Sequence, residues 1–245
     1  EEQTEIYVDE EVKAYQAGGG LTYDTTARQE ENKYNRIEVP RGSEYWIVLP
    51  DGTRVWLNAA TELKYPVRFV GKERRVYLSG EAYFEVQRDT TKPFIVVMNG
   101  NEVRVLGTEF NVRSYKDEKC QFTTLVTGKV LLTTSDRKCM ELLPNEQGIV
   151  DPQGELRKEQ VDVALYTAWK DGNFVFRKQC LENIMEIVER WYDLKVTFED
   201  EWCKQVSFSG NVERYDDFSK LAEMLEATGS VKFKIKNNEI YVTKR

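Results

Sequence analysis

Residues 49–86, LPDGTRVWLNAATELKYPVRFVGKERRVYLSGEAYFEV, decide the fold class of the first half of the chain. Short segments of alternating apolar and polar residues are separated by turn-forming residues, and apolar residues show no helical period. Near the start, Asp51-Gly52 lies between two apolar triplets, and both residues tolerate the positive φ that a tight hairpin turn requires. The stretch therefore predicts β structure with a hairpin at Asp51-Gly52.

The same pattern extends over residues 37–150. Some ten short segments of this kind follow one another at fairly regular spacing, and Asn99-Gly100 is a second favoured hairpin turn. Pro66 lies inside a predicted strand at 63–69 and cannot donate a hydrogen bond to a neighbouring strand, which indicates an edge or a bulge. We predict a mainly β N-terminal domain of short twisted strands, either a solenoid of stacked turns or a sandwich.

The remaining segments have different patterns. Residues 1–36 are polar and acidic and contain three consecutive glycines, so we predict a linker or loosely attached arm. The turn DPQG at 151–154 marks the predicted domain boundary, and residues 151–171 are predicted to be a connector with a short helix. In residues 172–245 a strand, a helix and a strand occur twice before a terminal strand, which predicts an α+β domain of two βαβ-like repeats.

Both helices predicted in this repeat are amphipathic. Asp217 precedes the second helix as its predicted N-cap, and Gly229 is placed to end it. The apolar positions that we expect in the core are Leu181, Ile184, Ile187, Val188, Phe218, Leu221, Met224 and Leu225.

The composition excludes several classes of function. The chain has 245 residues and a formal net charge of -7, and its basic residues are scattered, so the concentrated cationic surface of a nucleic-acid-binding protein is missing. It contains no histidine, which removes Ser-His-Asp and Cys-His catalysis and histidine-ligated zinc. We expect no nucleic-acid partner, no metal and no cofactor.

The sequence contains no run of apolar residues close to the roughly 20 that a membrane-spanning helix requires. It also begins with Glu1 instead of Met. We therefore expect any membrane anchor to lie upstream of this chain.

The four cysteines lie far apart and form no Cys-x-x-Cys motif. Cys120 could pair with Cys139, and Cys180 with Cys203, in an oxidising compartment. The alternative, which the sequence leaves open, is four unpaired and partly buried thiols.

Carboxylates and basic residues in the opening stretch have simple structural explanations. Glu81 and Glu85 would lie about 13 Å apart on a strand, too far for a glycosidase pair, and we interpret them as exposed solvating acids. Three basic residues near a predicted strand edge are interpreted as protection against edge-to-edge pairing. They are Lys72, Arg74 and Arg75.

Aromatic residues are frequent in the first domain and could line a carbohydrate-binding surface. Alternating aromatics also stabilise sheets by cross-strand packing, which is the simpler interpretation. The residues concerned are Tyr45, Trp46, Trp56, Tyr65, Tyr77 and Tyr83.

Seven short motifs follow one another through the predicted β domain. They are VPRGS (39–43), LPDGT (49–53), VWLNA (55–59), VYLSGEAYFEV (76–86), KPF (92–94), VLGTEFNV (105–112) and VTGKV (126–130). In this order they resemble the FecR family of anti-sigma factors. Together the motifs cover most of residues 37–150, and their common order makes the resemblance specific.

The half from Trp169 onward resembles the C-terminal domain that accompanies the FecR domain. Its repeat is similar to the short signalling domain of secretins and TonB-dependent transporters (STN domain), in which two helices lie between a two-stranded and a three-stranded sheet. The resemblance thus implies an α+β domain, in agreement with the repeat described above.

The resemblance implies the periplasmic part of a single-pass inner-membrane regulator. In such a protein a cytoplasmic segment, absent from this chain, holds an extracytoplasmic-function (ECF) sigma factor. The periplasmic part senses the signalling domain of a TonB-dependent outer-membrane transporter. The family offers no catalytic residues, so we expect no enzymatic activity. The alternative, from the aromatic residues, is a carbohydrate-binding module of a cell-surface glycan uptake system.

We expect the partner-binding surface in the C-terminal domain. A short strand in a small sheet leaves an open edge to which a partner strand can add. The predicted contact residues are Trp202, Val206, Ser207, Phe208, Ser209 and Gly210.

Overall fold

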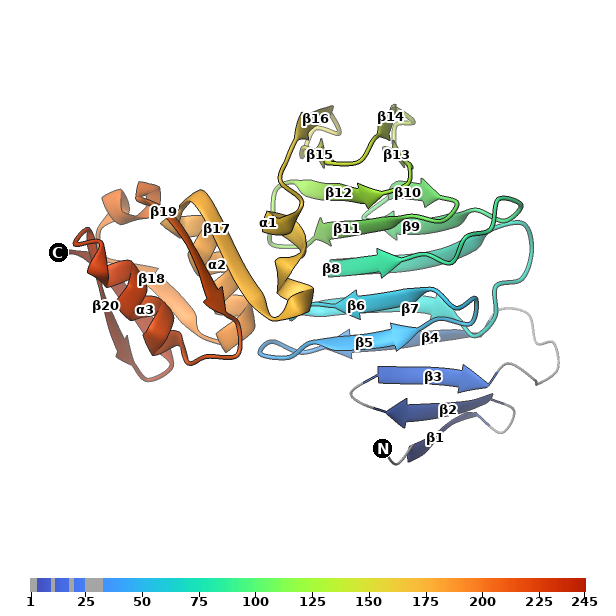
Figure 1. The fold of residues 1–245 in the computed structure, drawn as a ribbon, viewed down its shortest axis with the longest axis horizontal. Coiled ribbons are helices and arrows are strands. Elements are labelled where there is room, and N and C mark those ends of the chain that lie inside the picture. Colours follow the sequence, from blue (N-terminus) through green and yellow to red (C-terminus); the bar gives the residue numbers. More distant parts are fainter. Residues whose placement is uncertain (1–3, 10–11, 18–19, 25–32) are drawn as a thin grey trace. The chain divides into compact units, whose positions relative to one another are not determined.

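The structure is a computed structural model that describes residues 4–9, 12–17, 20–24 and 33–245 (Figure 1). The chain forms two compact units, Glu1–Pro40 with Glu44–Val163, and Arg41–Ser43 with Ala164–Arg245. Strands make up 49% of the residues and helices 16%, so the predicted fold class, mainly β followed by a smaller α+β part, is confirmed.

Within the described ranges, all elements assigned to the first unit up to Gln160 are strands. They are β1 (Thr4–Asp9), β2 (Val12–Ala17), β3 (Gly20–Asp24), β4 (Tyr34–Val39), β5 (Tyr45–Val48), β6 (Arg54–Leu57), β7 (Thr61–Pro66), β8 (Arg74–Glu85), β9 (Phe94–Met98), β10 (Asn101–Val105), β11 (Glu109–Ser114), β12 (Gln121–Thr127), β13 (Val130–Thr133), β14 (Cys139–Leu142), β15 (Glu146–Val150) and β16 (Leu156–Gln160).

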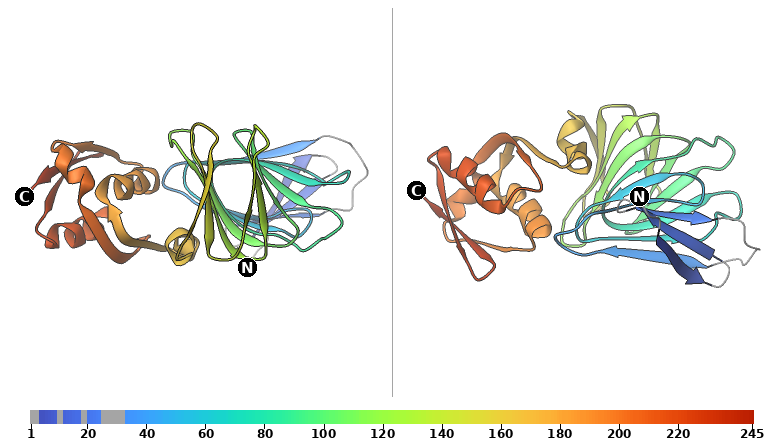
Figure 2. Two further views of the ribbon diagram at one scale, coloured as in Figure 1. Left: turned by 90° about the horizontal axis from the view of Figure 1, so that it is seen from above. Right: turned by 60° about the horizontal axis from the view of Figure 1, so that its bottom comes forward.

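These strands form two layers that share β8 (Figures 1 and 2). One layer has the order β1-β2-β3-β5-β6-β8-β11-β12-β15-β16, and the other has the order β4-β7-β8-β9-β10-β13-β14. From β9 onward, pairs of consecutive strands alternate between the layers, which is the winding expected of stacked turns. The core lies between the layers, where the Phe84 and Phe110 rings stack with centroids 5.2 Å apart.

Gly80 marks the point at which β8 passes from one layer to the other. The strand pairs with β7 and β9 before Gly80 and with β6 and β11 after it. Gly80 has φ +119°, and a Cβ atom there would lie 2.7 Å from the Cα of Thr61. Only glycine fits this close approach without displacement of the neighbouring backbone.

Both predicted hairpin turns are present. Gly52 has φ 85°, and its N–H donates to the carbonyl of Leu49 at 2.9 Å. Asn99 and Gly100 both have positive φ, 44° and 88°, as a type I′ turn requires. The expectation for Pro66 was wrong. β7 pairs with both β4 and β8, so it is not an edge strand. Pro66 is the last residue of β7, where the missing N–H is tolerated without a bulge.

Two segments outside the predicted β domain also contain strands. The DPQG turn at 151–154 joins β15 to β16, which pair antiparallel from Val150 opposite Leu156, and the division between the units follows Val163. The predicted arm, 1–36, lies partly outside the described residues. Its described part includes β1, β2 and β3, and β3 pairs with β5.

The second unit contains two small sheets and two main helices. Its elements are α1 (Ala164–Thr167), η1 (Ala168–Asp171), β17 (Asn173–Cys180), α2 (Leu181–Tyr192), β18 (Lys195–Phe198), η2 (Glu201–Gln205), β19 (Ser207–Glu213), α3 (Phe218–Ala227), β20 (Val231–Lys236) and β21 (Glu239–Lys244). β17 and β19 pair antiparallel, and the other sheet has the order β18-β21-β20.

The two helices and the two sheets share one hydrophobic core. Six of the eight apolar positions expected there are buried, and Ile187 and Met224 are partly buried. Asp217 occupies the N-cap position of α3 without a side-chain capping bond, and Gly229, with φ 79°, follows the last turn of the helix. The predicted repeat is therefore present as β17-α2-β18 and β19-α3-β20.

No helix within the described ranges has the length and apolar character needed to cross a membrane.

Candidate partner-binding site

The predicted contact residues follow one another in the second unit (Figure 1). Trp202 lies in η2, Val206 lies between the two elements, and the other four residues lie in β19. Trp202 in η2 is 52% exposed, and the Lys244 ammonium lies 5.0 Å from its ring centroid. The next residue, Cys203, is fully buried, and desolvation raises the pKa of its thiol. Because Cys203 anchors the short helix in the core, Trp202 is directed toward solvent.

Side chains of β19 alternate between the core and solvent. Phe208 is 5% exposed and belongs to the core, whereas Ser207 and Ser209 are exposed. Phe208 can therefore offer a partner only its backbone. Gly210 lies against α3, because a Cβ atom there would be 3.1 Å from the Cε of Met224.

Two hydrogen bonds fix the direction of the β19 backbone groups. Leu181 N donates to Val206 O, and Arg214 N donates to Gly172 O, both at 2.8 Å. In an antiparallel pair, alternate residues direct both backbone groups to the neighbouring strand. The intervening residues therefore direct their N–H and C=O groups away from β17. We call the groups of Ser207, Ser209 and Asn211 the outward amides of β19. At the end of the strand, the Glu213 carbonyl accepts a hydrogen bond from Asp216 N at 3.4 Å and is not counted among them.

Arg214 anchors the end of β19 in a group of aromatic rings. The residue is 1% exposed, and its Nη1 donates to Trp169 O at 3.0 Å. The guanidinium carbon lies 5.4 Å from the centroid of Phe174 and 5.6 Å from that of Trp169. Trp191 donates from its indole N–H to Arg214 O at 2.6 Å. A buried cation among aromatic faces thus holds η1 and α2 against the end of β19.

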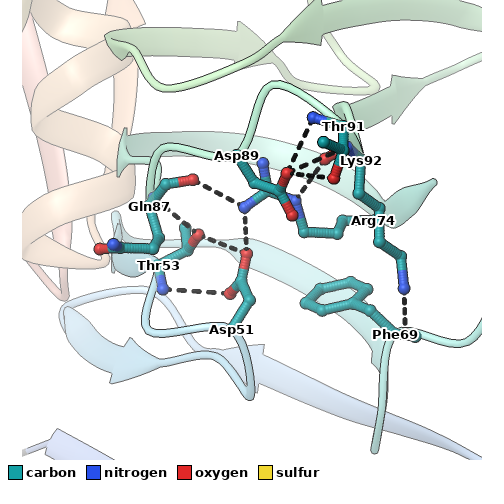
Figure 3. Close-up of polar contacts among 8 residues, drawn as sticks. All are labelled: Asp51, Thr53, Phe69, Arg74, Gln87, Asp89, Thr91 and Lys92. Atoms are coloured by element: carbon teal, nitrogen blue, oxygen red, sulfur yellow. Dashed lines mark hydrogen bonds and ion pairs between the residues drawn. The ribbon is translucent and has the colours of Figure 1, made fainter. Parts of the chain in front are cut away.

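The first unit contains an open recess of about 490 Å³ near the Asp51-Gly52 turn. Figure 3 shows the Arg74 guanidinium between the Asp51 carboxylate and the Gln87 carbonyl, each 2.7 Å away. Arg74 is only 2% exposed, so it is a buried partner of Asp51. The interpretation of Arg74 as a protective edge charge is wrong, because its side chain is buried and cannot repel another chain. The sequence did not show this, since its partner Asp51 lies 23 residues earlier in the chain.

The carboxylates at this recess are engaged as hydrogen-bond acceptors. Asp51 accepts from Thr53 N at 3.0 Å and from Thr53 Oγ1 at 2.8 Å. Asp89 accepts from Thr91 N at 2.9 Å and from Thr91 Oγ1 at 2.7 Å, which lowers the pKa of Asp89 (Figure 3). Each carboxylate accepts from the backbone N–H two residues later, as in an Asx turn, so both are structural parts of their own turns.

Glu81 is buried, in contrast to its interpretation as an exposed acid. It is 7% exposed and accepts hydrogen bonds from Asn58 Nδ2 at 2.8 Å and Asn111 Nδ2 at 2.9 Å. The sequence did not reveal this because the two amides come from distant segments, Asn58 from the turn after β6 and Asn111 from β11.

The six aromatic residues considered for a carbohydrate-binding surface do not form one exposed surface. Tyr65 is fully buried and Tyr83 is 3% exposed. Trp46 lies opposite Trp56, which packs edge-on against Tyr83 with ring centroids 5.8 Å apart. This is the cross-strand packing expected of such residues.

The structure has all four cysteines free, and the pairing of Cys120 with Cys139 and of Cys180 with Cys203 stays a prediction. Cys139 lies in the β13–β14 hairpin opposite Thr133, and Cys203 is buried in η2. The described residues contain no cluster of three potential metal ligands.

Comparison with protein families gives two matches in the order expected from the motifs. The model described as FecR protein matches residues 35–131, and the model described as FecR, C-terminal, matches residues 173–242. The chain belongs to the FecR family of anti-sigma factors. FecR is a regulatory, non-enzymatic class of protein.

Similar solved structures agree with this assignment. Two crystal structures of a "putative anti-sigma factor" from Parabacteroides distasonis ATCC 8503 are each 31% identical in sequence to this chain, with a TM-score of 0.79. The matches cover 86% and 87% of this chain and 99% and 100% of the solved chains. A comparison with curated proteins gave no match.

Two glutamates of the FecR C-terminal domain were missed in the sequence. Glu189 and Glu226 lie near the ends of α2 and α3, and each accepts a hydrogen bond from the backbone N–H seven residues later. An alignment of the two repeats, with Glu189 opposite Glu226, would have shown this shared position.

Proposed function

We propose that this chain is the periplasmic sensor part of a transmembrane anti-sigma factor. It relays the state of a TonB-dependent outer-membrane transporter to an ECF sigma factor by protein-protein contact. The sigma factor binds a segment outside this chain, upstream of a membrane span. The observation that supports this proposal is the ordered match of both FecR domains.

The partner in this proposal is the signalling domain of the transporter, and the contact lies on η2 and β19. Exposed tryptophans often contribute much of the binding energy at protein interfaces, and Trp202 is half exposed on a rigid support. Ser207 and Ser209 lie on the strand that follows. Cofactors and catalytic groups have no part in this mechanism.

Isothermal titration calorimetry tests the proposal. The full chain is titrated with the isolated signalling domain of the TonB-dependent transporter that is encoded beside it in the genome. We expect binding that weakens at least about tenfold in Trp202→Ala, since loss of a central aromatic anchor has an effect of this size. Tyr77→Ala is the matched control, because Tyr77 is also an exposed aromatic residue, at 37%, but lies in the first unit. No binding to the unmodified chain would contradict the relay, and equal losses in both variants would contradict the assigned surface.

A further inference from the structure

The three-stranded sheet of the second unit has closed edges. At one edge, Val196 N of β18 donates to Glu189 Oε1 at 2.7 Å. At the other edge, Phe233 N of β20 donates to Glu226 Oε1 at 2.6 Å. A carboxylate bound to an outward N–H occupies a donor that an added strand would need. We call Glu189 and Glu226 the edge-capping glutamates.

The edge at β20 carries further protection. Lys232, Lys234 and Lys236 are exposed on one face of this strand. Lysines on an edge strand disfavour pairing with another chain, because their charges repel one another and must be desolvated. Both edges of this sheet are therefore poor acceptors for a partner strand.

β17 in the two-stranded sheet is protected by a bulge. Its pairing with β19 shifts between Phe176 and Gln179, and Lys178 has φ 48°. The N–H of Lys178 donates to Ser209 Oγ at 2.9 Å. A bulge bends a strand and interrupts the regular row of edge groups that another strand would need.

β19 has none of these features within the described part of the chain. Its pairing segment contains no bulge on its own side, and no side chain or backbone group of the described residues bonds to its outward amides. The residues that carry these amides include Ser207, Ser209 and Asn211, whose short polar side chains leave the edge accessible. Natural proteins usually protect such an edge, so an unprotected one indicates a binding function.

We infer that β19 is the acceptor for an extended strand of the partner, which binds to the outward amides by β-strand addition. This inference rests on the proposed function and names the mode of binding at its site. The partner strand would carry apolar side chains on the face shared with Val212 and polar ones beside Ser209 and Asn211. Main-chain hydrogen bonds would provide the affinity, and the alternating faces would select the partner.

Two proline variants test the strand contact. Asn211→Pro and Ser207→Pro each remove one outward N–H and place a ring where the partner strand would lie. Neither removes a bond to β17, since both amides point away from it. Ser207 is the first residue of β19, and Val206 before it has φ -66° and ψ 126°, which a following proline accepts. Asn211→Ala and Ser207→Ala keep the N–H groups and are the matched controls.

The full chain with each variant is titrated with the isolated transporter signalling domain, and circular dichroism verifies that each variant folds. We expect each proline variant to bind at least about tenfold more weakly than its alanine control, as loss of main-chain pairing requires. Unchanged binding by both folded proline variants would overturn strand addition while the proposed function stands. If the unmodified chain does not bind, both the inference and the proposed function fail.

Amide hydrogen exchange of the free chain tests the inference without a partner. We expect the amides of Ser207 and Asn211 to exchange at least about tenfold faster than the capped amides of Val196 and Phe233. Slow exchange at Ser207 and Asn211 in the monomer would show that the edge is covered, and would overturn the inference. Pairing of β19 with a second copy, seen as a dimer that Asn211→Pro dissociates, would also overturn it.

Discussion

The guanidinium carbon of Arg214 lies 3.6 Å from the centroid of the Trp191 ring. Both residues are in the second unit, one directly after β19 and the other in α2. Contact at this distance requires a planar cation stacked on the ring face, which guanidinium offers and ammonium does not. Arg214 therefore couples the end of the proposed binding strand to the helix behind it.

Arg214→Lys should destabilise the second unit by about 2 kcal/mol, because lysine keeps the charge but loses the stacking. Urea unfolding followed by tryptophan fluorescence measures this change. Lys236→Arg is the control, since it exchanges the same two residue types at an exposed position. Equal stability of both variants would show that the stacking does not contribute.

Asp51→Ala should destabilise the first unit by about 3 kcal/mol, because the Arg74 charge would stay buried without its partner. The side chains of this pair are only 3% and 12% exposed. Glu38→Ala removes the exposed pair of Glu38 with Arg36 and should cost less than about 0.5 kcal/mol. Chemical denaturation compares the two, and similar losses would contradict a special role for the buried pair.

Gly80→Ala should cost at least about 2 kcal/mol, because the new methyl group meets the backbone of Thr61 in a strained conformation. Gly71→Ala is a matched control, as Gly71 also has positive φ, +81°, but a methyl group there would meet no atom within 4 Å. The control should lose about 1 kcal/mol from backbone strain alone. Equal thermal unfolding midpoints would contradict the close approach at β8.

Glu189→Ala and Glu226→Ala should open the edges of the three-stranded sheet. Hydrogen bonds to charged groups contribute about 1.5–3 kcal/mol, so the Val196 and Phe233 amides should exchange at least about tenfold faster in the respective variants. The double variant should also self-associate, as sedimentation velocity would show. Glu223→Ala, at an exposed position of α3, is the control. Unchanged exchange would mean that the carboxylates do not protect these edges.

Thermal stability should be nearly constant between about pH 5 and pH 9, because the chain contains no histidine. Hydrogen bonds from Arg75 lower the pKa of Glu73, and the N–H of Leu143 lowers that of Glu146. Stability from such lowered values is present above about pH 4.5 and is lost as these carboxylates become protonated at lower pH.

At the alkaline end, burial raises the pKa of Tyr192 to about 12. Stability from a raised value is present below about pH 10, the ordinary pKa of tyrosine, and is lost as the folded-state hydroxyl ionises at higher pH. Unfolding midpoints measured from pH 2 to pH 11 would show a plateau with two falling limbs. A step between pH 6 and pH 8 would contradict this expectation.

Local features of the fold were predictable from sequence because they depend on neighbouring residues. The turns at Asp51-Gly52 and Asn99-Gly100 follow from residues that accept positive φ. The buried faces of α2 and α3 follow from helical spacing. β16 was missed because four of its five residues are exposed, and a strand exposed on both faces shows no alternation.

The candidate site was predictable only in part. Trp202 and the strand after it were found from local pattern, and their positions on η2 and β19 follow from the structure. The burial of Glu81 and Arg74 could not be predicted, because it depends on partners 20 or more residues away, such as Asn58 and Asp51. The outward direction of the amides depends on register, which a single sequence does not determine.

The edge-capping glutamates occupy the same place in both halves of the second unit, seven residues before the amide that they bind. Both the carboxylate and the N–H that it binds therefore lie within one helix-to-strand unit. This suggests a rule for protein engineering. A glutamate in the last turn of a helix can bind the outward N–H of the strand that follows a short loop, and so disfavour the addition of another strand. Transferred to aggregation-prone α+β designs, such a residue would act as a built-in solubility element.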